Sequence, residues 1–167
     1  MKPRGVSLIE VLVALAIAAF GLLGTLALQA RALSAQKDAF QRRHAAELVG
    51  QFAERMRANH LAVLAGRYAF DFDAGEPAPA SVAPCAAPCS SEQVALRDLD
   101  EWRIEVRRRL PLSAAYVRWN ASAGSGVDIA VAWAEVATTS ADVACEALGL
   151  GARIPAGYRC YRARVLP

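Results

Sequence analysis

The pattern of hydrophobic positions changes sharply at residue 30. Residues 11–30 carry no charged side chain, and Gln29 is their only strongly polar one. As a helix this run is about 30 Å long, which matches the hydrocarbon core of a bilayer. It is also longer than the apolar region of a cleavable signal peptide. The pattern therefore predicts a membrane-inserted helix with Lys2 and Arg4 on the cytosolic side.

Beyond residue 30 the helical pattern continues and becomes amphipathic. Five large apolar residues recur there at spacings of seven, eight, four and four: Leu33, Phe40, Leu48, Phe52 and Met56. This spacing predicts one apolar stripe that packs on a globular partner. No proline lies between Pro3 and Pro77, so a single helix is expected over residues 6–64. A coiled-coil stalk is the alternative, but the heptads are irregular.

A second, short helix is predicted near residues 92–110. Its large apolar residues are spaced three, four and four and therefore share one face: Leu99, Trp102, Val106 and Leu110. Acidic side chains occupy the early turns and Arg107–Arg109 the last turn, which agrees with the helix dipole, and Pro111 follows. A strand through Trp102, Ile104 and Val106 is the alternative, which the charge polarity disfavours.

The C-terminal part of the chain predicts a small antiparallel sheet. Strands are expected over 115–120, 127–136 and 158–165, and the turn-rich segment 121–126 favours a hairpin between the first two. In the second strand the large side chains alternate with small or polar ones: Val127, Ile129, Val131 and Trp133. We expect this face to pack on the stripe of the long helix. The predicted fold class is thus α+β.

Residues 71–92 are expected to form a loop because prolines, glycine and small residues leave little to bury. Asp71, Asp73 and Glu76 partly match a calcium-binding loop. The bidentate glutamate of such a loop is missing, since its position is occupied by Val82. Metal binding is therefore not expected here.

Composition and charge exclude several classes of function. At 167 residues the chain holds one anchor and at most one modest globular domain. Without Lys2 and Arg4 it has 17 basic side chains against 16 acidic ones, which does not suggest a nucleic-acid partner. Arg107–Arg109 is interpreted as a solvated helix end, because no second basic cluster accompanies it. The only histidines, His44 and His60, belong to no catalytic motif, so neither enzymatic activity nor a cofactor is expected.

The first residues of the chain resemble a known family. Gly-Val-Ser-Leu-Ile-Glu-Val-Leu-Val-Ala-Leu (5–15) resembles the class III signal of type IV pilins and type II secretion pseudopilins. The resemblance implies that a prepilin peptidase cuts between Gly5 and Val6 and methylates the new amine of Val6. Val6 stands where the family usually has Phe or Met. Glu10 matches the carboxylate that in this family pairs with the N-terminal amine of a neighbouring subunit.

Glu10 needs a partner on physical grounds as well. A carboxylate inside an apolar helix costs roughly 2.5–3.5 kcal/mol on insertion scales, although less near the interface. A cleaved α-amine on the next helix is a compact cation that can supply the partner. The alternative is that Ser7 and Glu10 form a capping box at the start of the helix.

A second resemblance lies further along the long helix. Arg55-Met-Arg-Ala-Asn59, followed by Gly66-Arg-Tyr68, resembles the signature of PilV-type minor pilins, also called type IV pilus modification proteins. From its residues alone this segment is interpreted as a helix end, terminated by Asn59 or Gly66, with basic side chains near the carbonyl pole.

The family resemblance implies a complete layout. Residues 1–5 would be the leader, 6–30 the transmembrane and assembly helix, 31–68 its amphipathic continuation, and 69–167 the globular head. The protein would sit in the bacterial inner membrane with a periplasmic head and then join an extracellular pilus. Its partners would be prepilin peptidase, other minor and major pilins and the assembly machinery. A minor type II pseudopilin, a DNA-uptake pilin and a non-polymerising periplasmic binding module are the alternatives.

Four cysteines behind an exported anchor favour disulfides. Cys85 and Cys89 are expected to pair locally, and a pairing across to Cys145 or Cys160 is the alternative. A C-terminal disulfide-bounded loop is common in pilins, so Cys145 and Cys160 fit that role by resemblance. A four-cysteine zinc site is disfavoured, because the last two cysteines are too far apart in sequence.

Overall fold

The computed structural model describes residues 7–82, 84, 85, 87–120, 126–135, 145, 154 and 157–166. The chain divides into two units, residues 1–40 and residues 41–167. Helix α1 (Leu8–Ala58) contributes its N-terminal part to the first unit and its C-terminal part to the second. The predicted leader, residues 1–5, lies outside the described residues.

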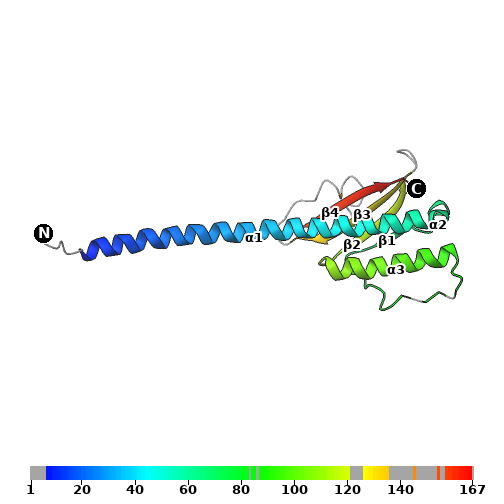
Figure 1. Cartoon of the computed structure of the whole chain (residues 1–167), viewed down its shortest axis with the longest axis horizontal. Helices are drawn as coiled ribbons and strands as arrows, with labels where there is room; N and C mark the ends of the chain where they lie inside the picture. Colours follow the sequence, from blue (N-terminus) through cyan, green and yellow to red (C-terminus); the bar gives the residue numbers. More distant parts are fainter. Residues whose placement is uncertain are drawn as a thin grey trace. The chain divides into compact units, whose positions relative to one another are not determined.

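The second unit is a head of helices on an antiparallel sheet (Figure 1). The strand order is β1-β2-β3-β4, and every neighbouring pair is antiparallel. This arrangement confirms the predicted α+β class. The elements that follow α1 are α2 (His60–Leu64), β1 (Phe70–Phe72), α3 (Ser91–Arg109), β2 (Ala114–Asn120), β3 (Gly126–Ala134) and β4 (Tyr158–Val165).

One face of the sheet packs against the helices of the head. The four alternating side chains of β3 belong to one buried cluster with residues of α1 and α3, as predicted: Val127, Ile129, Val131 and Trp133. Figure 1 shows the end of α1 and α3 lying along this sheet. The cluster is the main core of the head because its members are nearly all excluded from water.

The apolar stripe of α1 is only partly used by the head. Leu48, Phe52 and Met56 are each 1% exposed or less. Leu33 and Phe40, which were expected to share their environment, are 66% and 60% exposed and belong to the first unit. The prediction was therefore wrong for these two residues. The spacing of apolar residues shows which face of a helix they share. How many of them are buried depends on the length of the surface that packs against that face.

Helix α3 buries the face that its spacing predicted. Leu99, Trp102, Val106 and Leu110 are all at most 7% exposed, so the alternative of a strand is wrong. The Trp102 ring stacks on Phe52 with centroids 4.2 Å apart, and its Nε1 donates to the carbonyl oxygen of Leu48 at 3.0 Å. This one side chain thus joins α3 to α1 by both packing and a hydrogen bond.

Two boundaries differ from the predictions. Helix α1 ends at Ala58, and α2 begins at His60, so the expected single helix over 6–64 is interrupted at Asn59. Gly66 follows with φ +69°, a left-handed conformation that glycine adopts without strain. Residues 70–72 form edge strand β1, although 71–92 was expected to be a loop. Three residues are too few to show the two-residue period of a strand.

The opposite face of the sheet carries a second, smaller cluster. It includes Tyr116 of β2, Ala132 of β3 and Tyr158 and Cys160 of β4. Cys145 and Ile154 cover these residues. The sheet is therefore buried on both faces, and this explains why Ala130 and Ala132, between the large residues of β3, are at most 1% exposed.

Candidate functional site

The N-terminal part of α1 is an apolar helix with an exposed surface. A stretch of 18 residues in α1 has a mean hydropathy of 2.6, and none of it is buried within the described structure. By length and composition this is the one helix among the described residues that can cross a membrane. Leu8, Leu15, Phe20 and Leu23 each leave more than 60% of their surface exposed. Such a surface calls for lipid or other apolar helices as its surroundings.

Glu10 stands in the first turn of this helix. Its backbone nitrogen donates to the carbonyl oxygen of Ser7 at 3.0 Å, so helical hydrogen bonding begins here. The residue is exposed, and it is the only charged residue among the described ones before Arg31. The positive pole of the helix favours a carboxylate at this end. Gly5 and Val6, the expected cleavage site, lie outside the described residues.

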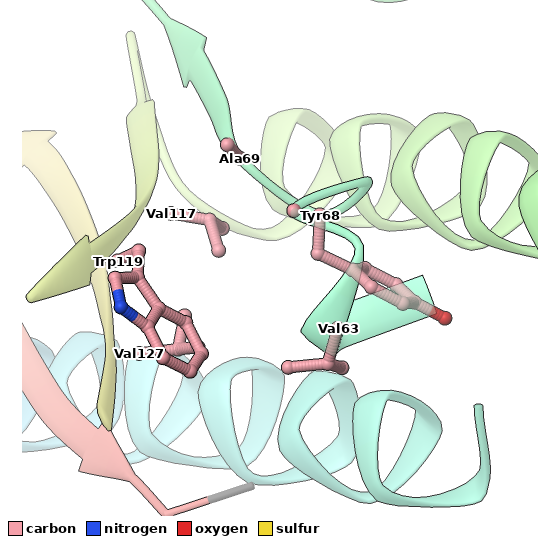
Figure 2. Close-up of a pocket in the computed structure, with 7 residues that line it drawn as sticks. Val63, Tyr68, Ala69, Val117, Trp119 and Val127 are labelled. Atoms are coloured by element: carbon pink, nitrogen blue, oxygen red, sulfur yellow. The ribbon is translucent and has the colours of Figure 1, made fainter. Parts of the chain in front are cut away.

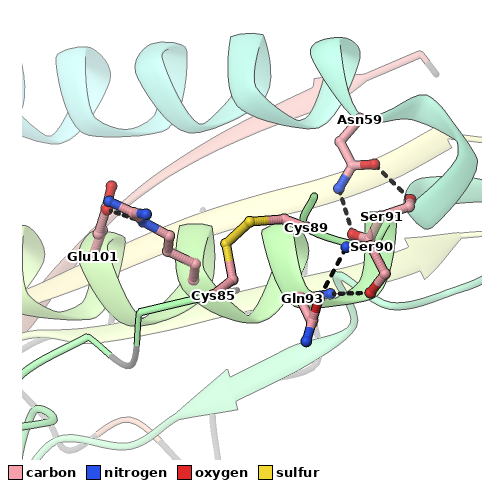
Figure 3. Close-up of a disulfide and its surroundings, with 8 residues drawn as sticks. Asn59, Cys85, Cys89, Ser90, Ser91, Gln93 and Glu101 are labelled. Carbon is pink, nitrogen blue, oxygen red and sulfur yellow. Dashed lines mark hydrogen bonds and ion pairs between the residues drawn. A yellow bond between two sulfur atoms is a disulfide. The ribbon is translucent and has the colours of Figure 1, made fainter. Parts of the chain in front are cut away.

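The helix-end motif around Asn59 organises a contact between α1 and α3. The Asn59 amide donates to the Tyr68 hydroxyl at 3.2 Å and to the carbonyl oxygen of Ser91 at 2.8 Å. In return, the Ser91 hydroxyl donates to Asn59 Oδ1 at 2.6 Å (Figure 3). Asn59 therefore ends α1, as predicted, and also fixes the first turn of α3.

Tyr68 and Arg55 extend this network along α3. The Tyr68 hydroxyl, on a side chain only 2% exposed, donates to Asp98 Oδ2 at 2.6 Å. Burial, and then the bond to Asp98, raises the pKa of Tyr68. Arg55 lies 2.6 Å from Glu101 and 3.5 Å from Asp98.

From the sequence, Arg55 is interpreted as a basic side chain near the carbonyl end of the long helix, and no contact is predicted for Tyr68. Both side chains instead connect to α3. The i, i+4 spacing of Arg55 and Asn59, which puts them on one face of α1, was the available signal for their common role.

Comparison with protein families gives two adjacent matches. The family model of the prokaryotic N-terminal methylation motif matches residues 1–26. The Tt1218-like model, described as type IV pilin Tt1218, matches residues 27–100, which include Asn59, Tyr68 and Ser91. The chain belongs to the type IV pilins. No curated protein and no solved structure matches the pilin at a significant level.

As a type IV pilin the protein is a structural protein and not an enzyme. Its methylation motif implies processing by a prepilin peptidase. The two histidines, His44 and His60, lie far apart on α1 and α2, and His44 instead contacts Glu47 at 3.6 Å. No group of three or more potential metal ligands occurs among the described residues.

The four cysteines of the pilin form two disulfides, Cys85–Cys89 and Cys145–Cys160. All four sulfurs are thereby used, which leaves no thiolate to bind zinc. The Cα atoms are 5.6 Å apart in the first pair and 5.5 Å in the second, within the usual range.

The Cys85–Cys89 bridge leads directly into the start of α3. Ser90 is the N-cap, and its side chain accepts from the Gln93 nitrogen at 3.2 Å. The Gln93 side chain accepts from the Ser90 nitrogen at 2.9 Å, which completes a capping box (Figure 3). The next residue, Ser91, bonds Asn59. The bridge, the cap and the helix-end motif of the pilin thus meet at one point.

Arg107 is not the solvated helix end that the sequence suggested. Its guanidinium donates to the carbonyl oxygens of Asp73, Glu76 and Ser113 and lies 4.4 Å from the centre of the Phe72 ring. Burial lowers the pKa of Arg107. The side chain therefore ties the segment after β1 to α3. Its neighbour Arg108 is exposed and pairs with Glu105 at 2.9 Å.

The acidic residues of β1 and of the segment that follows it have protein partners. Asp71 forms two bonds with Arg118, at 2.9 and 3.1 Å, and Asp73 accepts from the Tyr116 hydroxyl at 3.0 Å. Glu76 accepts from the Asp73 nitrogen at 3.1 Å. Asp71 thus ties β1 to β2, whereas Asp73 and Glu76 belong to a hydrogen-bonded turn in the segment after β1.

The head also contains a small apolar pocket between α2 and strands β2 and β3. Its lining comes from α2, the following turn, β2 and β3, and its cavity volume is about 20 Å³ (Figure 2). Trp119 stands at this pocket with 43% of its surface exposed. The lining residues are Val63, Gly66, Tyr68, Ala69, Val117, Trp119 and Val127.

Proposed function

We propose that this type IV pilin is a minor pilin of PilV type, matured by prepilin peptidase and incorporated into a type IV pilus. The observation that carries the proposal is the exposed apolar helix with one carboxylate, Glu10, in its first turn. Simple anchoring in a membrane needs the apolar surface but has no use for that carboxylate. Assembly against other helices gives a role to both.

Maturation is proposed to hydrolyse the peptide bond between Gly5 and Val6. The new α-amine of Val6 then receives one methyl group and remains a cation. Lys2 and Arg4 favour the cytosolic side for this reaction. The match to the N-terminal methylation motif over residues 1–26 supports this step.

Glu10 is proposed to pair with the methylated amine of a neighbouring subunit. The carboxylate lies on an otherwise uncharged helical stretch, Leu8–Ala30. Its desolvation is costly there, and no other charged side chain of the stretch competes for the amine. Charge pairing in such surroundings is stronger than in water. The pair would therefore set the depth at which one subunit helix lies beside the next.

The minor-pilin subtype is supported by the segment from Arg55 to Tyr68. Its residues hold α3 to the end of α1. This arrangement gives the PilV-type signature a structural role in the head. We propose that the head is periplasmic while α1 is in the inner membrane, and that it is displayed on the pilus after assembly. The proposed partners are other pilins and the inner-membrane assembly machinery, and no nucleic acid is proposed.

Intact mass tests the maturation step. Expression with a prepilin peptidase should remove residues 1–5 and add one methyl group to Val6, because the motif places the scissile bond there. The same chain expressed without the peptidase should keep its full mass. A chain with the same uncut mass in both conditions would contradict the proposal and favour a non-polymerising anchored module.

Replacing Glu10 with alanine should abolish incorporation into pili while leaving membrane insertion intact, because only the assembly contact needs the charge. The amount of the variant in sheared pili and in membranes, measured by immunoblot, checks this. Thr25→Ala is a matched control, since it removes the hydroxyl that donates to Leu22 within the same apolar stretch. Equal incorporation of Glu10→Ala and wild type would refute the assembly role. Recovery of wild type only in a secretion pseudopilus would identify the pseudopilin alternative.

A further inference from the structure

The heptads are irregular over the long helix as a whole, but the first unit alone carries a regular heptad pattern that the head does not use. Large apolar or glutamine side chains follow one another at alternating spacings of four and three from Leu8 to Phe40, interrupted only by the small Ala19. We name this row the leucine seam; its members are Leu8, Leu12, Leu15, Ala19, Leu22, Leu26, Gln29, Leu33, Gln36 and Phe40. The regular repeat ends at Phe40, since the next large residue of the stripe, Leu48, follows after eight positions.

The charges of the first unit lie away from the seam. Glu10, Arg31 and Asp38 are separated by 21 and 7 residues, so all three share one heptad position, the one opposite the seam. Lys37 is the only charged residue that flanks the seam, and its neighbours along both flanks after residue 29 are alanines 30, 32 and 39. The helix thus presents an uncharged, mainly apolar edge with small flanks on one side and its charges, Glu10 among them, on the other.

Lipid cannot cover the whole seam. Counted from Ala30, the end of the charge-free run, Phe40 lies about 15 Å further along the helix. The headgroup layer adds only roughly 5–7 Å to each side of the hydrocarbon core. Phe40 contacts its own chain and still leaves 60% of its surface exposed, and Leu33 is 66% exposed. Phe40, at the outer end of the seam, therefore lies beyond the reach of lipid.

We propose that the leucine seam is a second interface of this pilin, which pairs two copies of the chain in parallel before assembly. Two copies inserted in one membrane have the same orientation and depth, so equal residues face each other along the seam. Leu33 then meets Leu33 of the second copy, and Gln29 and Gln36 can hydrogen-bond to their counterparts. Lys37 faces Ala32 of the second copy, so self-pairing brings no like charges together.

The position of Glu10 gives this pairing a consequence. Because Glu10 lies opposite the seam, one helix can contact a second copy through its seam and another subunit through its carboxylate. Two exposed heptads alone are too short for a stable coiled coil in water. Insertion in the membrane aligns the copies and raises their effective concentration, which compensates for the short contact. The inference rests on the proposed function in that it requires a membrane-inserted pilin.

Cross-linking of single cysteines tests the seam in the full chain. Leu33→Cys and the matched control Ala35→Cys lie at nearly the same depth on opposite sides of the helix. All four native cysteines form disulfides, so they do not react with a short bis-maleimide. Two differently tagged copies are expressed together, without assembly machinery, and membranes are treated with the reagent. Leu33→Cys should give dimers containing both tags, about tenfold more than Ala35→Cys, as expected for residues inside and outside a helical seam.

A charge in the seam should abolish the pairing. With Phe40→Cys as the reporter, Leu33→Glu should lower the dimer yield about tenfold, because it removes an apolar contact and opposes two like charges. Ala35→Glu adds the same charge on the other side and should leave the yield unchanged. Equal dimer yields for Leu33→Cys and Ala35→Cys, or adducts only with a different protein, would overturn the inference.

Failure of this inference is distinguishable from failure of the proposed function. A chain that the peptidase cuts and that enters pili, but does not cross-link through Leu33→Cys, would disprove self-pairing alone. A chain that is never cut or incorporated would disprove the proposed function. Mass and membrane content are therefore measured on the same samples.

Discussion

Replacing Trp102 with alanine should destabilise the head by about 3–5 kcal/mol, the usual cost of removing a large buried aromatic side chain. Trp102 is 4% exposed, its ring stacks on Phe52, and its Nε1 donates to the Leu48 carbonyl. The variant loses all three contributions and leaves a cavity between α3 and α1. Urea unfolding of the full chain in detergent, followed by near-ultraviolet circular dichroism, measures the change.

Leu96→Ala is the matched control for this prediction. Leu96 lies on the same helix and is 58% exposed, so its truncation should change the free energy of unfolding by no more than about 0.5 kcal/mol. Similar costs for Leu96→Ala and Trp102→Ala would show that the contact between α3 and α1 does not stabilise the head. Trp102→Phe separates the packing of the ring from the hydrogen bond. Phenylalanine keeps an aromatic ring beside Phe52 but cannot donate to the Leu48 carbonyl.

Removal of the two disulfides should have unequal effects. Cys145 and Cys160 are 15 positions apart, and Cys85 and Cys89 are 4 apart. In the loop-entropy model the longer loop is worth about 3 kcal/mol and the shorter one about 2 kcal/mol. Alanine at both positions of the longer bridge should therefore cost about 1 kcal/mol more than alanine at both positions of the shorter one.

The comparison uses the same unfolding measurement on the two double variants and on wild type. Each bridge serves as the control for the other, because each change removes two sulfurs. A larger loss from the Cys85–Cys89 variant would contradict the entropic argument. It would instead assign the main role to the contact of that bridge with the start of α3 and the Asn59 network.

The local patterns of the sequence predicted most of the head. The four alternating residues of β3 and the four apolar residues of α3 are buried as their periods indicated. The helix end at Asn59 was also among the two positions that the motif allowed. These features depend on periodicity and on end signals, which neighbouring residues determine.

Contacts between distant segments could not be predicted from these patterns. Tyr68 and Asp98 are 30 positions apart, and Arg107 reaches Asp73 over 34 positions. Nothing local distinguishes such a side chain from one that is solvated. The exposure of Leu33 and Phe40 was missed for a related reason, since it depends on where the head ends. The roles of Gly5, Val6 and Glu10 remain predictions from the sequence.

The separation of the chain into two units has a further consequence for the order of events. Every buried apolar residue of the described core comes from Ala45 onward, and the apolar stretch of α1 that could cross a membrane contributes none of its surface to that core. If α1 moves from lipid into a filament, as proposed, the buried core of the head loses none of its contacts. The head can complete its folding and form its disulfides beforehand and be carried through assembly unaltered.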